Sequence, residues 1–318
     1  MKNSEGYMES YFGIMFHYFH DQSKNIKCQG SLSASDLVDI IEFSKKNFRL
    51  LDANEYVILA EKNKLEPDMA CLTFDDGLLC QYEVAMPVLN HYGISAFWFI
   101  YTMPFMEGEK RDKLEIYHYF RNAYFDTITE FYNAFFDYLK KTKFFLEYNI
   151  SEEIKSFKPE KYRPDCEFYT YDDRLFRYTR SNILKMDYHV IMEQMMNSYG
   201  FKYKTADLWI KPEQLKNMAQ SGQVIGLHTH THNTDLCSLT YDEQKREWEE
   251  NKKRLKNIIQ CDLIAASYPC GNYNIHSIDI LKRNKIKLAF SDRISKENKY
   301  GNLSIDRVDS TKFMNLMR

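Results

Sequence analysis

The chain has 318 residues and a formal net charge of −2, with 44% hydrophobic and 28% charged residues. This composition is typical of soluble globular proteins and excludes a disordered or fibrous chain. The near-neutral charge gives no electrostatic basis for binding nucleic acid or an anionic membrane. The seven cysteines are scattered and form no CxxC pair, which favours reduced thiols over a disulfide framework. With no signal-peptide pattern in the first twenty residues and no apolar run long enough for a transmembrane segment, we expect a cytoplasmic protein.

The first third of the chain alternates strand and helix signals. The apolar run Tyr11–Phe19 predicts a buried strand, and Ser33 is a suitable N-cap for a helix over the following LVDIIEF. Met69–Phe74 predicts a second buried strand. A helix is expected over Tyr82–Tyr92, and Ile94–Tyr101 predicts a third strand. This order is typical of α/β proteins with a parallel sheet.

The middle of the chain breaks this rhythm. Segments such as LEIYHYFRNAYF and ITEFYNAFFDYL carry aromatic residues at helical spacing, so we interpret residues 104–207 as a helical insertion. The α/β parts are then residues 1–103 and 208–318. The aromatic residues of the insertion form either a small core of their own or part of a substrate groove, and the sequence leaves both interpretations open.

The α/β rhythm returns at Lys211. Pro212 begins a helix that ends at Gly222, and the short strand QVIGL leads into His228. A capping box at Thr240–Glu243 predicts a long charged helix to about residue 260. The remaining pattern predicts a strand, a helix, a strand and a late strand, over residues 263–268, 275–283, 287–290 and 304–309.

Two polar clusters directly follow predicted strands. The first is Asp75-Asp76-Gly77, and the second is His228-Thr-His-Thr-His232. Functional groups of parallel α/β folds gather where loops leave the carboxyl ends of strands, so the two clusters are expected to meet. Two imidazoles and one carboxylate are a common ligand set for a catalytic divalent metal. Each cluster alone is also compatible with a plain turn or polar loop, but their joint occurrence favours the metal site.

Thr73-Phe-Asp-Asp-Gly77 followed by His228–His232 resembles the motifs of the polysaccharide deacetylase (NodB-homology) family, carbohydrate esterase family 4. The resemblance implies a distorted (β/α) barrel, usually of seven strands. It implies removal of acetyl groups from N-acetylated sugars with a divalent metal, commonly Zn²⁺. It also implies Asp75 as the catalytic base, and as metal ligands Asp76, His228 and His232.

Other segments extend the resemblance. Thr229 stands where the family uses Ser or Thr to shape the loop, and Ser267–Gly271 resembles the third motif of the family. That motif supplies a backbone amide to the oxyanion, which here belongs to Cys270. The resemblance covers residues 11–101 and 211–310, so the insertion lies outside it. The opening MFHYFHD with QGSLSA resembles a bacterial subgroup found among surface-polysaccharide genes.

The third motif departs from the family pattern. Its usual Arg, which orients the base, is replaced by Ser267. Arg307 lies in a segment that alternates like a late strand, and from there its side chain would reach Asp75 and keep that carboxylate ionised. The alternative is an ordinary surface salt bridge.

The general acid of the family is also missing, because no His follows His276. His17 and His20 end the first predicted strand, which neighbours the last strand in a barrel. Either imidazole would become a suitable acid if a carboxylate such as Asp21 or Asp309 raised its pKa, and we favour His17. The alternative is that both are ordinary loop or core residues.

Three functions fit these observations. They are a metal-dependent N-deacetylase of an amino sugar, a related amidohydrolase of a non-sugar C–N bond, and a non-catalytic carbohydrate-binding relative. The complete ligand set together with Asp75 argues against the third. A cytoplasmic location favours a precursor of a surface glycan, such as a nucleotide sugar or a lipid-linked sugar, over finished polymer. The sequence leaves the exact substrate and the oligomeric state open.

Overall fold

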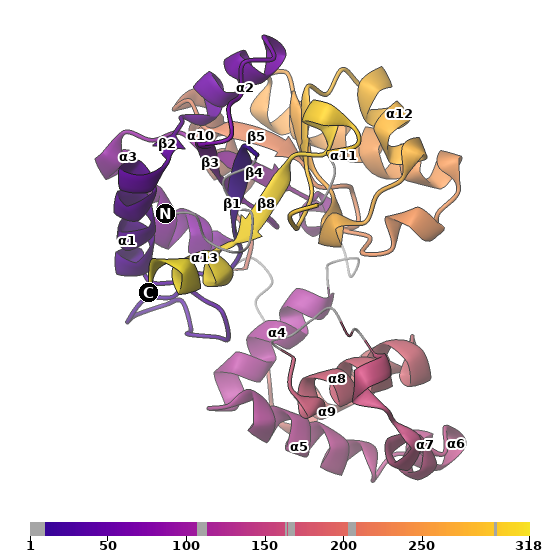
Figure 1. The fold of residues 1–318 in the computed structure, drawn as a ribbon. Coiled ribbons are helices and arrows are strands. Elements are labelled where there is room, and N and C mark those ends of the chain that lie inside the picture. Colours follow the sequence, from indigo (N-terminus) through magenta and orange to yellow (C-terminus); the bar gives the residue numbers. More distant parts are fainter. Residues whose placement is uncertain (1–9, 107–112, 163, 165–168, 203–207, 296–297) are drawn as a thin grey trace. The chain divides into compact units, whose positions relative to one another are not determined.

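Figure 1 shows the computed structural model, which describes residues 10–106, 113–162, 164, 169–202, 208–295 and 298–318. The chain divides into two compact units. Residues 1–112 together with 206–318 form an α/β unit, and residues 113–205 form a helical unit. The helical unit is therefore inserted, in sequence, between two segments that fold together.

The α/β unit is built on one parallel sheet with the strand order β7-β6-β5-β4-β3-β1-β8, and β2 pairs with the start of β3. The two edge strands, β7 and β8, come close to closing the sheet into a barrel. Phe290 at the end of β7 forms a parallel bridge with Ile305, which precedes β8, and the Ser291 N–H donates to the Ile305 carbonyl at 2.8 Å. The predicted (β/α) barrel is confirmed. The strands are β1 (Phe12–Phe16), β2 (Arg49–Leu50), β3 (Met69–Phe74), β4 (Phe97–Ile100), β5 (Val224–Leu227), β6 (Ala265–Ser267), β7 (Leu288–Phe290) and β8 (Asp306–Asp309).

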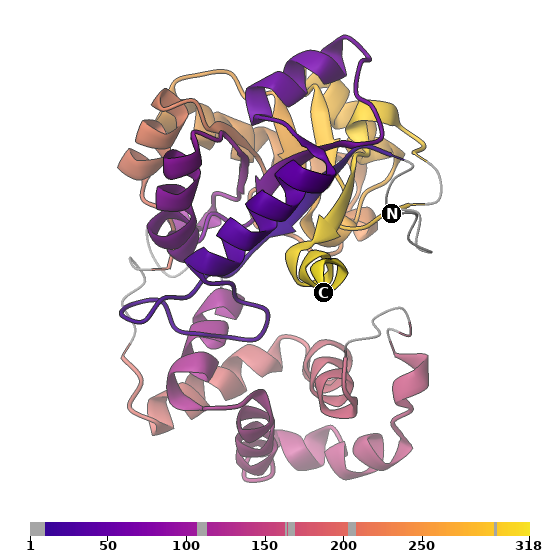
Figure 2. The same cartoon turned by 60° about the vertical axis from the view of Figure 1, so that its left-hand side comes forward.

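Helices cover the outside of this sheet (Figures 1 and 2). Ser33 and Thr240 form the capping boxes that begin α1 and α11, and Gly93 ends α3 with a left-handed φ of 63°. The α-helices are α1 (Ala34–Asn47), α2 (Ala53–Glu61), α3 (Met86–Tyr92), α10 (Pro212–Gln220), α11 (Tyr241–Ile259), α12 (Ile275–Arg283) and α13 (Ser310–Met317). Shorter turns are the π-helix η1 (Gln81–Ala85) and the 3₁₀-helices η2 (Met103–Phe105), η6 (Leu236–Ser238), η7 (Pro269–Gly271) and η8 (Gly301–Leu303).

Apolar residues fill both faces of the strands, which is why the strands are continuous hydrophobic runs. On β3, Leu72 and Phe74 pack in the cluster shared with the covering helices, whereas Cys71 belongs to a second cluster. Phe97 and Phe99 of β4 join that second cluster, which lies on the opposite face of the sheet. The alternation places successive β3 side chains on opposite faces, so Thr73 and Asp75 share the face of Cys71.

The predicted elements of the α/β unit match the structure within a few residues, with two differences of extent. The strand expected over Tyr11–Phe19 ends at Phe16, because the His17 carbonyl accepts a hydrogen bond from the Gln81 side chain at 2.7 Å rather than from a neighbouring strand. The strand expected over Ile94–Tyr101 is restricted to Phe97–Ile100. The sequence pattern did not indicate α2 or α13.

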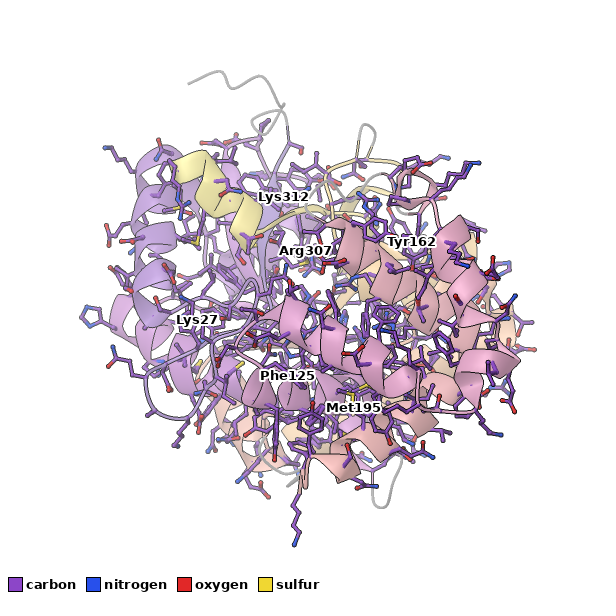
Figure 3. All side chains as sticks on the ribbon, turned by 90° about the horizontal axis from the view of Figure 1, so that it is seen from below. Lys27, Phe125, Tyr162, Met195, Arg307 and Lys312 are labelled. Atoms are coloured by element: carbon purple, nitrogen blue, oxygen red, sulfur yellow. The ribbon has the colours of Figure 1, made fainter. Side chains whose placement is uncertain are left out.

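The helical unit has an aromatic core of its own. Tyr132 stacks on Phe176 with ring centroids 4.7 Å apart, and Phe135 and Tyr188 are buried beside them. Figure 3 labels Phe125 and Met195 of this cluster. The helices are α4 (Lys113–Tyr124), α5 (Ile128–Leu139), α6 (Phe144–Glu147), α7 (Ile150–Ser156), α8 (Tyr171–Tyr178) and α9 (Asp187–Ser198), with the turns η3 (Pro159–Lys161) and η4 (Thr179–Leu184).

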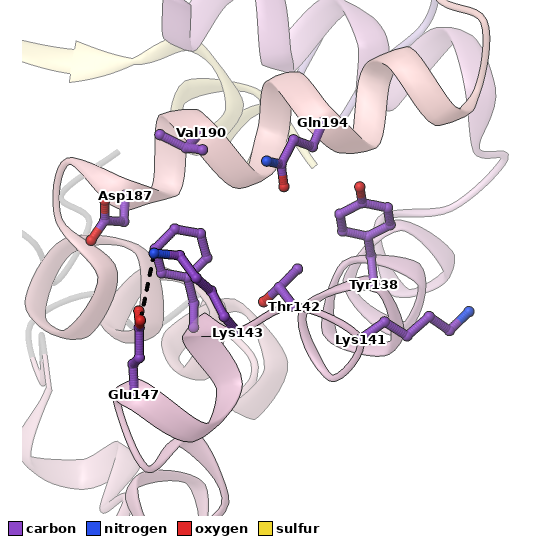
Figure 4. A pocket seen from close by; sticks show the side chains of 9 residues that line it. Tyr138, Lys141, Thr142, Lys143, Glu147, Asp187, Val190 and Gln194 are labelled. Carbon is purple, nitrogen blue, oxygen red and sulfur yellow. Dashed lines mark ion pairs between the residues drawn. The ribbon is translucent and has the colours of Figure 1, made fainter.

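The surface of the helical unit carries a hollow of about 670 Å³, lined by residues from α5, α6, α9 and the turn after α5 (Figure 4). Its wall includes the ion pair between Lys143 and Glu147, whose charged atoms are 3.5 Å apart. Among the described residues, no helix combines the length and the apolar character that crossing a membrane requires.

Candidate metal centre and catalytic site

The turn after β3 holds two adjacent carboxylates. Asp76 has a left-handed φ of 75°, and Gly77 follows with a φ of 61°. A Cβ at Gly77 would lie 2.8 Å from the Ile100 Cδ1, so the turn needs glycine there for space as well as for conformation. The Asp75 N–H donates to the Phe16 carbonyl, and only 2% of Asp75 and 6% of Asp76 is exposed.

The loop after β5 brings His228 to the same place. Its Nδ1 lies 2.9 Å from the Ser267 carbonyl, which only accepts hydrogen bonds. The proton of the neutral imidazole is therefore on Nδ1, and Nε2 carries a lone pair. This arrangement, with one ring nitrogen fixed by a backbone carbonyl, is the usual way in which a protein orients a metal-binding histidine.

Asp76, His228 and His232 form a compact set of possible ligands. The Oδ1 of Asp76 lies 3.3 Å from the Nε2 of His228 and 3.2 Å from the Nε2 of His232. All three ligand atoms lie within 4.8 Å of one another. That Oδ1 is buried and has no hydrogen-bond donor among the described residues. The Nε2 lone pair of His228 and the Asp76 oxygen repel at this distance, and the Nε2 of His232 lies equally close, so the three side chains fit a divalent cation between them.

Arg307, a residue of β8, pairs with Asp75 through two hydrogen bonds. Its Nη1 and Nη2 donate to the two carboxylate oxygens of Asp75, each at 2.7 Å, and the guanidinium is almost completely buried. Its other N–H groups donate to the Thr73 hydroxyl, the Ser267 hydroxyl and the Ser291 carbonyl. Every N–H of the guanidinium therefore donates a hydrogen bond.

This pairing determines the charge of Asp75. Burial is the largest single influence on the Asp75 carboxyl and raises its pKa, but the Arg307 guanidinium, with further contributions from His228 and His17, brings the pKa below its ordinary value. The Ser267 hydroxyl adds a hydrogen bond to Asp75 at 3.1 Å. Gly13 of β1 makes room for the pair, because a Cβ there would lie 3.1 Å from the Arg307 Cγ. Asp75 is thus a buried carboxylate that stays ionised near neutral pH.

The remaining predicted residues differ in their surroundings. Cys270 lies in η7, directly after β6, with a left-handed φ of 51° and an exposed side chain. His17 follows β1 and is near enough that its charge lowers the pKa of both Asp75 and Asp76, although it is not the main influence on either. The His20 Nδ1 instead lies 2.9 Å from the Ser31 hydroxyl.

The carboxylates expected beside these imidazoles are engaged elsewhere. Asp21 accepts hydrogen bonds from the backbone of residues 23–25 in its own turn. Asp309 caps α13 by accepting from the Thr311 N–H at 2.9 Å. These hydrogen bonds of both aspartates are thus local, because short polar side chains at a turn and at a helix start bond to the nearby backbone.

Two residues of α11 that the sequence did not indicate contact the loop of His228–His232. Glu247 accepts hydrogen bonds from the N–H groups of His230 and Thr231, and Asn251 accepts from the His228 N–H at 3.0 Å. Asn251 is fully buried on the apolar face of α11. A polar residue at an apolar position of a charged helix was the available signal, but it does not identify the partner.

Comparisons with known proteins give the family and the fold of this chain. The sequence profile of the family described as Polysaccharide deacetylase matches residues 108–289. A stretch of 62 residues is 40% identical to YxkH of Bacillus subtilis (strain 168), whose name places it among the polysaccharide deacetylases. That match spans 20% of this chain and 22% of YxkH, so it covers about a fifth of each protein.

Solved structures of deacetylases share the fold. The Streptococcus pyogenes deacetylase PplD in complex with acetate is 17% identical, with a TM-score of 0.53 over 97% of this chain and 98% of PplD. IcaB from Ammonifex degensii is 15% identical, with a TM-score of 0.55 over 97% and 95%. A de-N-acetylase from Aggregatibacter actinomycetemcomitans is 14% identical, with a TM-score of 0.54 over 97% and 99%. Because the family profile covers more than half of the sequence, this chain belongs to the polysaccharide deacetylase family.

Proposed function

We propose that the protein is a metal-dependent hydrolase that removes the N-acetyl group from an amino sugar. The observation that carries this proposal is the buried, ionised Asp75 beside the ligand set of Asp76, His228 and His232. A carbohydrate-binding protein gains nothing from a buried carboxylate that needs a buried arginine to stay charged. A hydrolase needs both a ligand set and a separate base.

Asp76, His228 and His232 would hold the metal, with Zn²⁺ as the expected ion. When bound, a divalent metal supplies Lewis acidity toward the amide carbonyl and makes water more acidic. Asp75 accepts the proton of the attacking water, because Arg307 keeps it ionised and its oxygens face the ligand set. Arg307 thereby takes the orienting role of the arginine that the third motif lacks.

The oxyanion and the leaving group require two further residues. The backbone amide of Cys270 donates a hydrogen bond to the oxyanion of the tetrahedral intermediate. An amine is a poor leaving group unless it is protonated, so a general acid must donate to the sugar nitrogen. We assign this role to His17 and keep His20 as the alternative, because the charge of His17 acts on both aspartates.

The substrate that we propose is an N-acetylated sugar in a bacterial surface-polysaccharide pathway, carried as a nucleotide sugar, a lipid-linked sugar or a glycan. The proposed location is the cytoplasm. Support comes from free thiols at Cys71, Cys237 and Cys261, which are unusual in an oxidising compartment.

The test is release of acetate and of free amine from a panel of N-acetylated sugars, nucleotide sugars and oligosaccharides. Each is incubated with chelator-treated protein before and after Zn²⁺ is added, and Asp75→Asn serves as the control for contaminating hydrolases. The proposal predicts Zn²⁺-dependent release of acetate and amine in equal amounts. Ammonia or another acid instead of acetate would identify a different amidohydrolase, and no release from any compound would argue against the proposed hydrolysis.

A further inference from the structure

The loop that joins His228 to His232 has an unfavourable backbone. Thr229 and His232 have φ values of 60° and 54°, in the left-handed region that residues other than glycine avoid. Such conformations persist only where the surrounding structure imposes them. The two histidines proposed as ligands are separated by this strained segment, so whatever holds the segment also sets the distance between the imidazoles.

Glu247 of α11 holds the middle of the loop. Its Oε2 accepts from the N–H groups of His230 and Thr231, at 3.0 and 2.8 Å, and its Oε1 accepts from the Thr231 hydroxyl at 2.9 Å. One carboxylate therefore receives three hydrogen bonds from two consecutive residues. Hydrogen bonds to an ionised acceptor are stronger than those between neutral groups.

Asn251 holds the start of the loop, one helical turn further along α11. Its Oδ1 accepts from the His228 N–H at 3.0 Å, and its Nδ2 donates to the Ile100 carbonyl at 2.9 Å and to the Thr102 hydroxyl at 3.2 Å. The amide thus joins the end of β4 to the first histidine of the loop. Glu247 and Asn251 lie four residues apart, so both project from the same face of the helix.

Thr229 contributes no such contact. Its hydroxyl is buried and has no hydrogen-bonding partner among the residues that the structure describes. The family resemblance assigns the shaping of this loop to the residue at this position, but side-chain hydrogen bonds to the loop backbone come from α11. The N–H groups of Thr102 and Met103 also donate to the His230 carbonyl, and the Thr102 hydroxyl lies 2.8 Å from the His230 Nδ1, so both α11 and the end of β4 hold the loop.

We propose that Glu247 and Asn251 are positioning residues that set the spacing of His228 and His232 and thereby the affinity of the site for a divalent metal. The inference rests on the proposed function in one respect, the metal-binding role of the two histidines. Partners of this kind around a metal ligand typically change metal affinity by about 10–100-fold when they are removed.

The test measures metal binding rather than turnover. Chelator-treated full-length protein is titrated with Co²⁺, and the dissociation constant is taken from the visible absorption of the bound ion. For Glu247→Ala and Asn251→Ala we expect the constant to rise by roughly 10–100-fold. Glu249→Ala, on the same helix and half-exposed beside Lys245, is the matched control and should bind as the wild type does.

Two conservative variants separate geometry from charge. Glu247→Gln keeps the length of the side chain and an oxygen for both N–H groups, so it should bind Co²⁺ within a few-fold of the wild type. Glu247→Asp keeps the charge but is one methylene too short, so it should bind weakly. Thr229→Val should leave the affinity unchanged. Thermal unfolding of the metal-free variants shows whether each is folded, and Glu247→Asp carries the test if Glu247→Ala does not fold.

The possible outcomes are distinct. If Glu247→Ala and Glu247→Asp bind Co²⁺ as tightly as the wild type, the inference is wrong while the proposed metal site stands. If Thr229→Val weakens binding as much as Glu247→Ala does, the threonine holds the loop and the inference also fails. If the wild type binds no Co²⁺, the metal site of the proposed function fails and takes the inference with it.

Discussion

Replacing Arg307 with methionine removes a buried cation from a buried carboxylate. Met is close to Arg in length and fills the apolar part of its site, so the packing against Gly13 and Phe99 is largely kept. What disappears is the pair of 2.7 Å hydrogen bonds to Asp75, together with the bonds to Thr73, Ser267 and Ser291. Asp75 then keeps its burial without its largest compensating charge.

The magnitude follows from that imbalance. Removing one partner of a buried ion pair costs about 3–5 kcal/mol of stability, because the other charge is left unpaired. Replacing both partners removes the unpaired charge, so Asp75→Asn in the Arg307→Met background should recover part of that loss. Urea unfolding of the chelator-treated wild type, the two single variants and the double variant measures the coupling between the two side chains.

The contribution of Asp75 to the free energy of unfolding should depend on pH with opposite sign in the wild type and in Arg307→Met. In the wild type the pKa of Asp75 lies below its ordinary value, so its stabilising contribution is complete above about pH 4 and is lost as the pH falls through the lowered pKa. In Arg307→Met, burial dominates and raises the pKa of Asp75. The protonated carboxyl is then favoured at low pH, and stability is lost as the pH rises above about 4. The difference between the two proteins should therefore grow with pH.

A small and pH-independent loss of stability in Arg307→Met would contradict this role of the Asp75–Arg307 pair. If the free energy of unfolding of Arg307→Met lies less than about 1 kcal/mol below that of the wild type between pH 4 and 8, Arg307 does not control the charge of the Asp75 carboxyl. The same holds if the acid limb of the pH–rate profile stays where the wild type has it, because a raised Asp75 pKa must move that limb to higher pH.

Three further predictions concern individual residues. Asp75→Asn should retain bound metal but lose turnover by roughly 100-fold or more, which metal analysis and steady-state kinetics measure together; loss of the metal would instead make Asp75 a ligand. His17→Asn should reduce turnover and remove the basic limb of the pH–rate profile, whereas His20→Asn, whose imidazole contacts Ser31, should leave both nearly intact; two unaffected variants would exclude both histidines as the acid. Gly13→Ala should lower the free energy of unfolding by about 1–3 kcal/mol, because the new Cβ would lie 3.0 Å from the Thr73 Cγ2 and 3.1 Å from the Arg307 Cγ. A free energy of unfolding in urea equal to that of the wild type would show that the strands separate easily at this position.

The fold and the convergence of Asp76, His228 and His232 were predictable because their signals are local. Apolar runs followed by Asp75-Asp76-Gly77 and by His228–His232 mark strand ends in a parallel fold, and the structure brings those ends together. Arg307 was recognisable as a candidate because its segment alternates like a strand. In a nearly closed barrel that late strand pairs with the first one, which puts the guanidinium beside Asp75.

The supporting contacts could not be predicted from such patterns. Glu247 and Asn251 sit in a charged helix, and nothing local distinguishes Glu247 from the exposed Glu249 beside it. Ser267 stands where the third motif of the family usually has Arg, and the sequence indicated no role for it. In the structure its hydroxyl contacts Asp75 and its carbonyl contacts His228. These roles depend on how α11 and β6 pack against the loop, so only the three-dimensional arrangement reveals them. The local hydrogen bonds of Asp21 and Asp309, to a turn and to the start of α13, were likewise not indicated by the sequence.

We propose that Asp76, His228 and His232 together hold one catalytic metal ion. Elemental analysis of Zn²⁺-loaded, desalted wild-type protein and of His228→Ala tests it most directly, with circular dichroism to establish that both are folded. We predict about one equivalent of Zn²⁺ per chain in the wild type and almost none in the variant. A folded His228→Ala protein that retains the wild-type amount of Zn²⁺ with unchanged affinity, or a wild type that retains none, would contradict the claim.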